Sequence, residues 1–279
     1  MSTYYDLPLL KPPVWTWEVP TYFFVGGAAG AAAALGAIAQ VTGADQTLVR
    51  DARWIAAAGA TLSAPLLVAD LGRPERFLNM LRVFKLQSPM SVGAWTLTAF
   101  GSASSAAAFA ELVQRRTNLP VRVVGDASAV VAAATGLVMA TYTGVLLGAT
   151  AIPVWNENVR LLPVHFGASA LGSAVSLLEL RGHRDRALNA LGLGTAIFET
   201  LVAASLDAGD DRVNAPLTRG RSGTLVRLAG ALSGPVPLAL RLFGARKAAA
   251  IATLAGSLAT RFAWVEAGKA SARDPRVAL

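Results

Sequence analysis

The 279-residue sequence contains no cysteine, which excludes a thiolate-ligated iron–sulfur cluster or metal site and any disulfide bond. It has only two histidines, His165 and His183, and the second lies in a charged stretch where it cannot share a haem with the first. A bis-histidine haem is therefore not expected, and no residue is assigned to a metal. If the protein handles electrons, its redox centres must lie on a partner or on a diffusible molecule.

Charged residues are also scarce. They make up 15% of the chain, whereas 54% of the residues are hydrophobic, a balance typical of integral membrane proteins. The net charge of +8 would suggest nucleic acid in a soluble protein, but here Lys and Arg fall between apolar segments. We therefore expect membrane lipid, not nucleic acid, around a single all-α, polytopic domain over residues 1–279.

Residues 1–19 have no basic region before an apolar core, so they are not expected to be a cleavable signal peptide. Trp15 and Trp17 instead suit an interfacial lead-in. Eight apolar segments follow, each close to the roughly 20 residues that a helix needs to cross the membrane. They cover approximately residues 22–42, 53–71, 90–113, 127–150, 161–180, 187–206, 225–243 and 248–267.

We expect residues 20–150 to form a four-helix bundle with a binding site at one membrane face. Residues 151–267 form a second four-helix bundle, and 268–279 a C-terminal tail. Pro65 in the second segment, and Pro235 with Pro237 in the seventh, should kink or interrupt their helices.

The connector between the second and third segments carries clear helix signals. Gly72 and Pro74 stop the preceding helix at Asp70, which places a carboxylate at the membrane boundary. Ser88 followed by Pro89 starts the next helix, because the hydroxyl can cap it and the proline suits its first turn.

Eight crossings place both termini on one side, which we name face A. Face A carries the lead-in, the 70–89 connector, residues 152–160, residues 207–223 and the tail. The opposite side, face B, carries compact basic turns, around Arg50, Arg115 and Arg116, residues 181–186, and Arg246 with Lys247. The positive-inside rule places face B in the cytoplasm, although basic residues are almost as frequent on face A.

Alternating crossings bring polar residues together on face A. Glu18 precedes the first helix, Asp70 ends the second, and Tyr142 lies about two turns inside the end of the fourth. A quinone needs hydrogen-bond donors for its carbonyls, groups that relay protons, and aromatic or apolar walls. We therefore assign Glu18 and Asp70 as candidate catalytic residues. The candidate quinone-binding residues are Trp17, Tyr22, Arg73 and Tyr142.

Each of these residues also has a structural interpretation. Glu18 could be a helix-start charge, Asp70 with Arg73 a loop salt bridge, and Tyr142 an interfacial packing residue. The basic residues that follow on the connector suit acidic lipid or a partner subunit better than catalysis. They are Arg76, Arg82 and Lys85.

Glu199 and Arg261 lie inside the sixth and eighth segments, where a lone charge costs about 2.5–3.5 kcal/mol on insertion scales. We expect them to pair or to share a polar cavity. His165 lies one turn inside the fifth segment. A structural ion pair and a proton path through these residues both remain open.

Several motifs resemble one known family, the NrfD-like membrane subunits of polysulfide reductase and related molybdoenzymes. The resemblance is dense over residues 15–150, and the 70–93 connector is its most specific part. The motifs are Trp15-x-Trp17, Tyr22-Phe23-x-x-Gly26-Gly27-x-x-Gly30, Asp70-Leu-Gly-Arg-Pro with Phe77 and Asn79, Ser88-Pro-Met-Ser-x-Gly93-x-Trp95, and Tyr142-Thr-Gly144-x-Leu-Leu147.

This resemblance implies an eight-helix, haem-free subunit of a prokaryotic cytoplasmic membrane that exchanges electrons with quinone or menaquinone as a diffusible substrate. It implies docking of a ferredoxin-like iron–sulfur subunit on the side of the termini, and that subunit serves a molybdopterin catalytic subunit. Tyr142 and Asp70 match the types that contact the quinone headgroup, and Glu18 stands where some relatives have a histidine.

Two other functions fit the same residues. Glu199, Arg261 and the interrupted seventh segment also suit a secondary transporter or proton channel. A passive anchor that tethers a redox subunit is the third possibility. In none of these interpretations does the chain perform a complete redox reaction alone.

Overall fold

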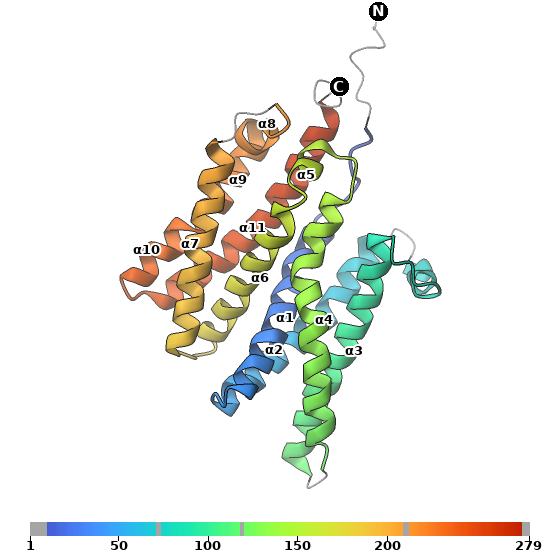
Figure 1. The fold of residues 1–279 in the computed structure, drawn as a ribbon, viewed down its shortest axis with the longest axis vertical. Helices are drawn as coiled ribbons and strands as arrows, with labels where there is room; N and C mark the ends of the chain where they lie inside the picture. The colour runs from blue at the N-terminus through green and yellow to red at the C-terminus, as the bar shows by residue number, and fades with distance from the viewer. Residues whose placement is uncertain (1–9, 71–73, 118–119, 209–211, 275–279) are drawn as a thin grey trace, which may run out of the picture.

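A computed structural model of the chain describes residues 10–70, 74–117, 120–208 and 212–274, apart from the side chains of residues 74, 76 and 77. Every regular element in these ranges is a helix (Figure 1). The long helices are α1 (Glu18–Val41), α2 (Gln46–Asp70), α3 (Pro89–Arg116), α4 (Arg122–Gly148), α6 (Leu161–Leu180), α7 (Arg186–Ala208), α9 (Gly220–Ser233), α10 (Pro235–Leu242) and α11 (Arg246–Arg273).

Three short helices lie between the long ones. They are η2 (Pro74–Leu81), a 3₁₀ helix in the connector, α5 (Pro153–Glu157) and α8 (Ala215–Thr218). All three belong to segments that the sequence pattern assigns to face A as irregular connections. Figure 1 shows α5 and α8 near the end of α11, and η2 beside the start of α3.

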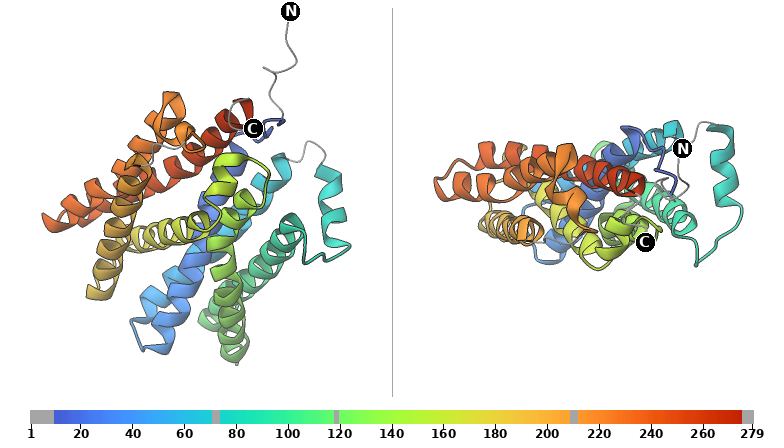
Figure 2. Two further views of the ribbon diagram at one scale, coloured as in Figure 1. Left: turned by 45° about the horizontal axis from the view of Figure 1, so that its top comes forward. Right: turned by 90° about the horizontal axis from the view of Figure 1, so that it is seen from above.

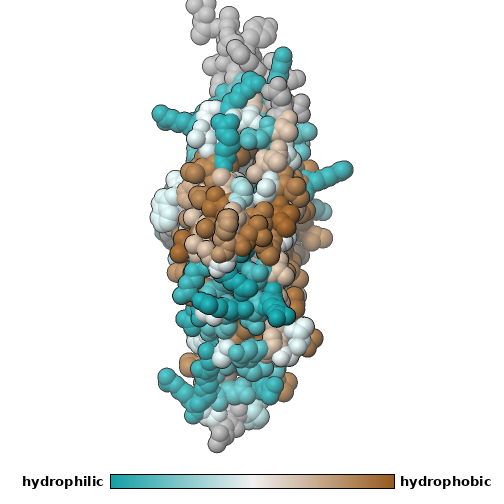
Figure 3. Space-filling model, turned by 90° about the vertical axis from the view of Figure 1, so that its left-hand side faces the viewer, coloured by the Kyte–Doolittle hydropathy of each residue, from teal (hydrophilic) through white to brown (hydrophobic). Residues whose placement is uncertain are grey.

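The prediction of an all-helical membrane protein is confirmed, but the count of eight crossings is not. Seven spans within the described helices are long and apolar enough to cross a membrane, with α9 and α10 counted as one. The remaining predicted crossing, α3, has 28 residues but is rich in Ser, Gly and Ala. Its mean hydropathy is therefore lower than that expected of a membrane-spanning helix. Figure 3 shows an apolar belt between hydrophilic zones on the side formed by the second half of the chain.

Helix α1 is the centre of the fold. It packs against α2, α4, α6 and α11, and most of its residues are buried. Its Ala- and Gly-rich sequence permits this, because small side chains allow helix backbones to approach closely. The two halves of the chain lie side by side in Figure 2 and meet where α6 packs on α1 and α4.

The predicted helix signals at the connector are correct. Helix α2 ends at Asp70, and α3 begins at Pro89 with Ser88 as its N-cap residue. The Ser91 backbone N–H donates to the Ser88 hydroxyl at 3.4 Å.

The predicted start of the second segment at residue 53 is wrong, because α2 begins seven residues earlier, at Gln46. The charges of this first part are satisfied by neighbouring helices. Asp51 accepts hydrogen bonds from Arg181 and His183, and Arg53 donates to Asp126 at 2.7 Å. The same correction applies at the other end of the chain, where α11 continues past residue 267 to Arg273.

The seventh predicted segment is interrupted. Helix α9 ends at Ser233, and α10 begins at Pro235 after Gly234. Gly234 lies directly against the backbone of Thr200 in α7, where a Cβ atom would come within 2.7 Å of the Thr200 nitrogen. Pro65, in contrast, is accommodated within a continuous α2.

Replacing Ser88 with Ala should lower the free energy of unfolding by about 1 kcal/mol, because one N-terminal N–H of α3 loses its acceptor. Denaturation of the purified protein in detergent, followed by circular dichroism, measures this change. Ser102→Ala is the matched control, since Ser102 is an exposed position inside α3 and should change stability by less than about 0.5 kcal/mol. Equal stability of both variants would contradict the capping role.

Candidate functional site

The lead-in before α1 is fixed at face A by aromatic contacts. Trp15 stacks on Trp155 of α5, with ring centroids 5.5 Å apart and planes 17° apart, and meets the ring of Phe23 edge-on. Trp155 is fully buried, and its indole N–H donates to the Trp264 carbonyl at 2.8 Å. The lead-in is therefore anchored to both halves of the chain.

This anchoring places two predicted carboxylates beside one hydroxyl. Thr16 Oγ1 lies within hydrogen-bonding distance of Glu18 Oε2 and 3.5 Å from Asp70 Oδ1. A hydroxyl has a single proton, so Thr16 can donate to only one of the two carboxylates at a time. Neither carboxylate is fully buried. Glu18, at the start of α1, and Asp70, at the end of α2, thus form a pair that can exchange protons with water at face A.

Tyr142 is held by α3 instead of by this pair. Its hydroxyl donates to the Pro89 carbonyl at 2.6 Å, and its ring lies against Gly93, where any Cβ atom would overlap it. Tyr22 is buried in α1, which packs against α4. Among the described contacts, none joins Tyr142 to Glu18 or Asp70. A quinone carbonyl would have to displace the Pro89 carbonyl to receive the Tyr142 proton.

The structure describes some of the other residues predicted at face A. Trp17 is 60% exposed at the start of α1. Arg82 and Lys85 are exposed on the connector. Arg73 and the side chain of Arg76 lie outside the described part of the structure.

The connector also exposes apolar side chains that the sequence analysis did not single out. Val83, Phe84 and Leu86 are each more than half exposed, and they alternate with Arg82 and Lys85. The Phe84 ring meets the exposed Trp95 ring of α3 edge-on at 6.2 Å. This mixture of basic and apolar side chains is suited to a protein partner or to the membrane interface.

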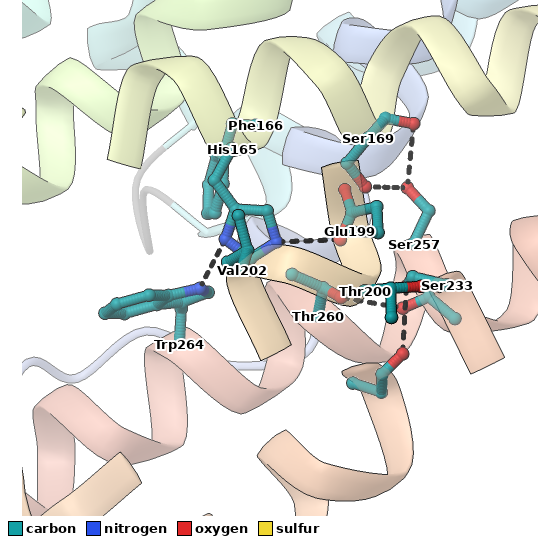
Figure 4. A network of polar contacts seen from close by, with 12 residues as sticks. His165, Phe166, Ser169, Glu199, Thr200, Val202, Ser233, Ser257, Thr260 and Trp264 are labelled. Carbon is teal, nitrogen blue, oxygen red and sulfur yellow. Dashed lines mark hydrogen bonds and ion pairs between the residues drawn. The ribbon is translucent and has the colours of Figure 1, made fainter. Parts of the chain in front are cut away.

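A second polar cluster lies inside the second half of the chain (Figure 4). His165 Nε2 and Glu199 Oε2 are 2.9 Å apart, and both side chains are buried. Trp264 Nε1 donates to His165 Nδ1 at 3.3 Å. With Nδ1 accepting, neutral His165 carries its proton on Nε2 and donates it to Glu199. The other carboxylate oxygen, Glu199 Oε1, is buried without a hydrogen-bond partner among the described residues.

This cluster borders a cavity of about 310 Å³ between α6, α7, α9 and α11. Most of its lining is apolar, but His165, Glu199, Thr200 and Thr260 contribute polar groups. Asp207, near the face A end of α7, and Arg227, in the middle of α9, also line it.

Arg261 forms no ion pair with Glu199 among the described contacts, so of the two predicted arrangements, an ion pair or a shared polar cavity, the first is wrong. Its guanidinium lies 3.9 Å above the Phe166 ring and donates to the Phe166 carbonyl at 3.0 Å. The described ion pairs include none between Arg261 and Glu199, because His165 takes the carboxylate. The two residues are near enough for electrostatic attraction, and Arg261 Nε and Nη1 are buried without partners among the described residues.

Thr16 and the pair of Glu179 with Arg241 are not among the site residues predicted from the sequence. Arg241 donates to both Glu179 oxygens, at 2.8 and 2.7 Å, and both side chains are almost fully buried. Arg241 is the only charge in the apolar part of the seventh segment beyond Pro235. A charge in that position, like Glu199 in the sixth segment, is a signal for a buried partner.

These features define a multi-pass, all-helical membrane protein with one polar cluster at face A and a second cluster between the later helices. The chain belongs to the NrfD family: the family model described as polysulphide reductase, NrfD, matches residues 8–184. This confirms the resemblance seen in the motifs, and members of the family are membrane subunits of redox enzyme complexes. No curated protein matches the chain. The matched region ends after α6, so Glu199, Arg241 and Arg261 lie beyond it.

Proposed function

We propose that this chain is the quinone-reactive membrane subunit of a respiratory oxidoreductase complex. It exchanges electrons between the quinone pool and a docked iron–sulfur subunit, which in turn serves a molybdopterin catalytic subunit. The observation that supports this function best is the pair of carboxylates, Glu18 and Asp70, beside the Thr16 hydroxyl at face A. Family membership supports the assignment to a redox complex.

The chemistry of a quinone fits this pair. Reduction of one quinone to quinol takes two electrons and two protons, and oxidation of quinol releases them. The chain has no cysteine to hold a cluster, so the electrons pass to or from the iron–sulfur partner. Glu18 and Asp70 handle the protons, because both carboxylates are within reach of water.

The aromatic residues near this pair bind the headgroup. Tyr22 and Trp17, on the first turns of α1, supply walls for the ring and the start of the isoprenoid tail. Tyr142 donates to a quinone carbonyl once its hydroxyl leaves the Pro89 carbonyl. Arg73, which lies outside the described residues, is the proposed cation for the headgroup.

The exposed connector is the proposed docking surface for the iron–sulfur subunit. Arg82 and Lys85 offer charge, and Phe84 and Leu86 offer apolar contact area, on the same face as the carboxylate pair. In this arrangement α3 also crosses the membrane, which brings the number of crossings to eight and places both termini on the partner's side. The complex lies in a prokaryotic cytoplasmic membrane.

A photoreactive menaquinone analogue tests the location of this site. In the assembled complex it should label peptides from the start of α1, the end of α2 or the end of α4, and excess menaquinol should compete with the label. Mass spectrometry of the digested chain identifies the labelled residues. Labelling confined to α6–α11 would contradict the proposed site, and an absence of competable label would favour a passive anchor.

A second candidate function, proton translocation, draws on His165, Glu199 and Arg261 in the later helices. The cavity beside the His165–Glu199 pair favours it. It is compatible with quinone exchange, because different helices form the two sites.

A further inference from the structure

One face of α6 carries a line of buried polar residues along almost the whole helix. The residues follow one another at intervals of three or four, which places them on the same side of the helix. From the first to the last they span about 21 Å, a large part of the roughly 30 Å hydrocarbon layer. We name this line the α6 stripe; it consists of His165, Ser169, Ser173, Ser176 and Glu179, none of them more than 5% exposed.

The end of the α6 stripe nearest face A borders the 310 Å³ cavity. There His165 bonds to Glu199, whose second carboxylate oxygen has no partner among the described residues. A buried carboxylate oxygen at a cavity of this size is a place where water is held, since water satisfies such groups. The carboxylate can therefore receive a proton from water inside the cavity.

The middle of the α6 stripe meets a further hydroxyl from α11. Ser169 Oγ donates to Ser257 Oγ of α11 at 2.8 Å (Figure 4). Ser173 and Ser176 donate to carbonyls of their own helix, which leaves lone pairs on both oxygens to accept a proton. The Cβ atoms of neighbours on one helix face lie about 5–6 Å apart, so transfer along the α6 stripe requires the hydroxyls to rotate and a water to enter between them.

The end of the α6 stripe nearest face B is closed by an ion pair. Glu179 accepts two hydrogen bonds from Arg241, whose guanidinium fills the space beside Gly192 so completely that a Cβ atom there would overlap it. Glu179 also lines a pocket of about 550 Å³ together with His183, Arg184 and other residues of the face B turns. One carboxylate thus lies between the buried hydroxyls and a pocket at the opposite face.

We propose that the second half of the chain contains a gated proton route between the two faces. A proton from the face A cavity binds Glu199, passes along the hydroxyls of the α6 stripe, and reaches Glu179 when Arg241 releases it. Only O–H and N–H bonds break and form, and no electrons move. The route rests on the second candidate function, proton translocation, and does not depend on the quinone site at the start of α1.

Proton flux into liposomes tests the route. The full-length chain is reconstituted in vesicles that contain a pH-sensitive dye, and a potassium diffusion potential drives proton entry. Arg241→Lys keeps the charge but loses the bidentate hydrogen bond to Glu179. Its proton flux should therefore be roughly tenfold higher than that of the wild type, in which the pair blocks the route. Adding Glu199→Gln or Ser173→Ala to this variant should return the flux to the wild-type rate.

The matched control is Arg53→Lys. Arg53 is a largely buried arginine, with 10% of its side chain exposed, that binds carboxylates near face B in the first half of the chain, away from the α6 stripe. Vesicles with Arg53→Lys should show the same proton flux as vesicles with the wild type. Thermal unfolding and gel filtration in detergent establish that each variant is folded. Arg241→Gln would also remove the positive charge and leave Glu179 buried without a partner, so the test uses Arg241→Lys, which keeps the charge.

Three results would overturn the proposal. If the proton flux of Arg241→Lys equals that of the wild type, the Glu179–Arg241 pair does not block a proton route. A leak that persists in the Glu199→Gln and Ser173→Ala double variants would not pass along the α6 stripe. A leak of equal size with Arg53→Lys, or one that carries sodium as well as protons, would indicate general disruption.

Discussion

Quinol-linked turnover of the assembled complex is expected to fall by about 100-fold or more when Asp70 is replaced with Asn or Glu18 with Gln. Both amides keep the size of the side chain but cannot exchange a proton with the quinone. The Thr16 hydroxyl lies beside both carboxylates, so each carboxylate depends on the same local geometry. Quinol oxidation, followed by absorbance in membranes that contain the complex, measures the loss.

Two further variants separate chemistry from structure. Glu157→Gln removes an exposed carboxylate of α5 on the same face and should leave turnover unchanged. Thr16→Val removes the shared hydroxyl while it keeps both acids, so turnover should fall by about tenfold, the worth of a hydrogen bond to a charged group. Co-purification of the partner subunits shows that assembly is intact. Full turnover in both the Asp70 and the Glu18 variants would reject their role in proton transfer.

The limits of the helices at the connector follow from local chemistry, which is why the sequence predicts them correctly. The end of α2 at Asp70 needs only Gly72 and Pro74, and the start of α3 needs only Ser88 and Pro89. The break between α9 and α10 likewise follows from Pro235, because a proline inside a helix removes a hydrogen bond and clashes with the preceding turn.

Partners that lie far apart in the chain could not be predicted in this way. Glu199 and Arg261 lie at similar depth, which suggested a pair, but His165 is closer and takes the carboxylate. The start of α2 lies seven residues before the predicted one for the same reason. Asp51 and Arg53 add charge at the edge of the apolar segment, and Arg181 and Asp126, from elsewhere in the chain, neutralise them.

The site at face A is predicted in part. The alternation of crossings correctly brings the lead-in to the end of α2, because both elements must lie at the same membrane surface. Alternation does not say which side chains touch. Tyr142 lies at the predicted depth, yet its hydroxyl is bound to Pro89 of α3, a contact that depends on how closely Gly93 lets the two helices approach.

The contact between α1 and α4 holds the first half of the chain together, and it should tolerate no side chain. A Cβ atom built on Gly136 would lie 2.6 Å from the Gly30 carbonyl oxygen and 3.1 Å from its Cα, closer than packed atoms can approach. Both neighbours are backbone atoms of a long buried helix, so neither can move aside alone.

Gly136→Leu should therefore lower the free energy of unfolding by about 3 kcal/mol or more, and Gly136→Ala should lower it in the same direction by less. Gly101 in α3 is the matched control, because a Cβ atom there meets nothing within 4 Å. Since Ala is favoured over Gly in a helix by up to about 1 kcal/mol, Gly101→Ala should stabilise the protein. Opposite signs for the two Ala variants, measured by denaturation in detergent, would establish that backbone contact and not helix propensity decides the packing of α1 on α4; equal signs would contradict it.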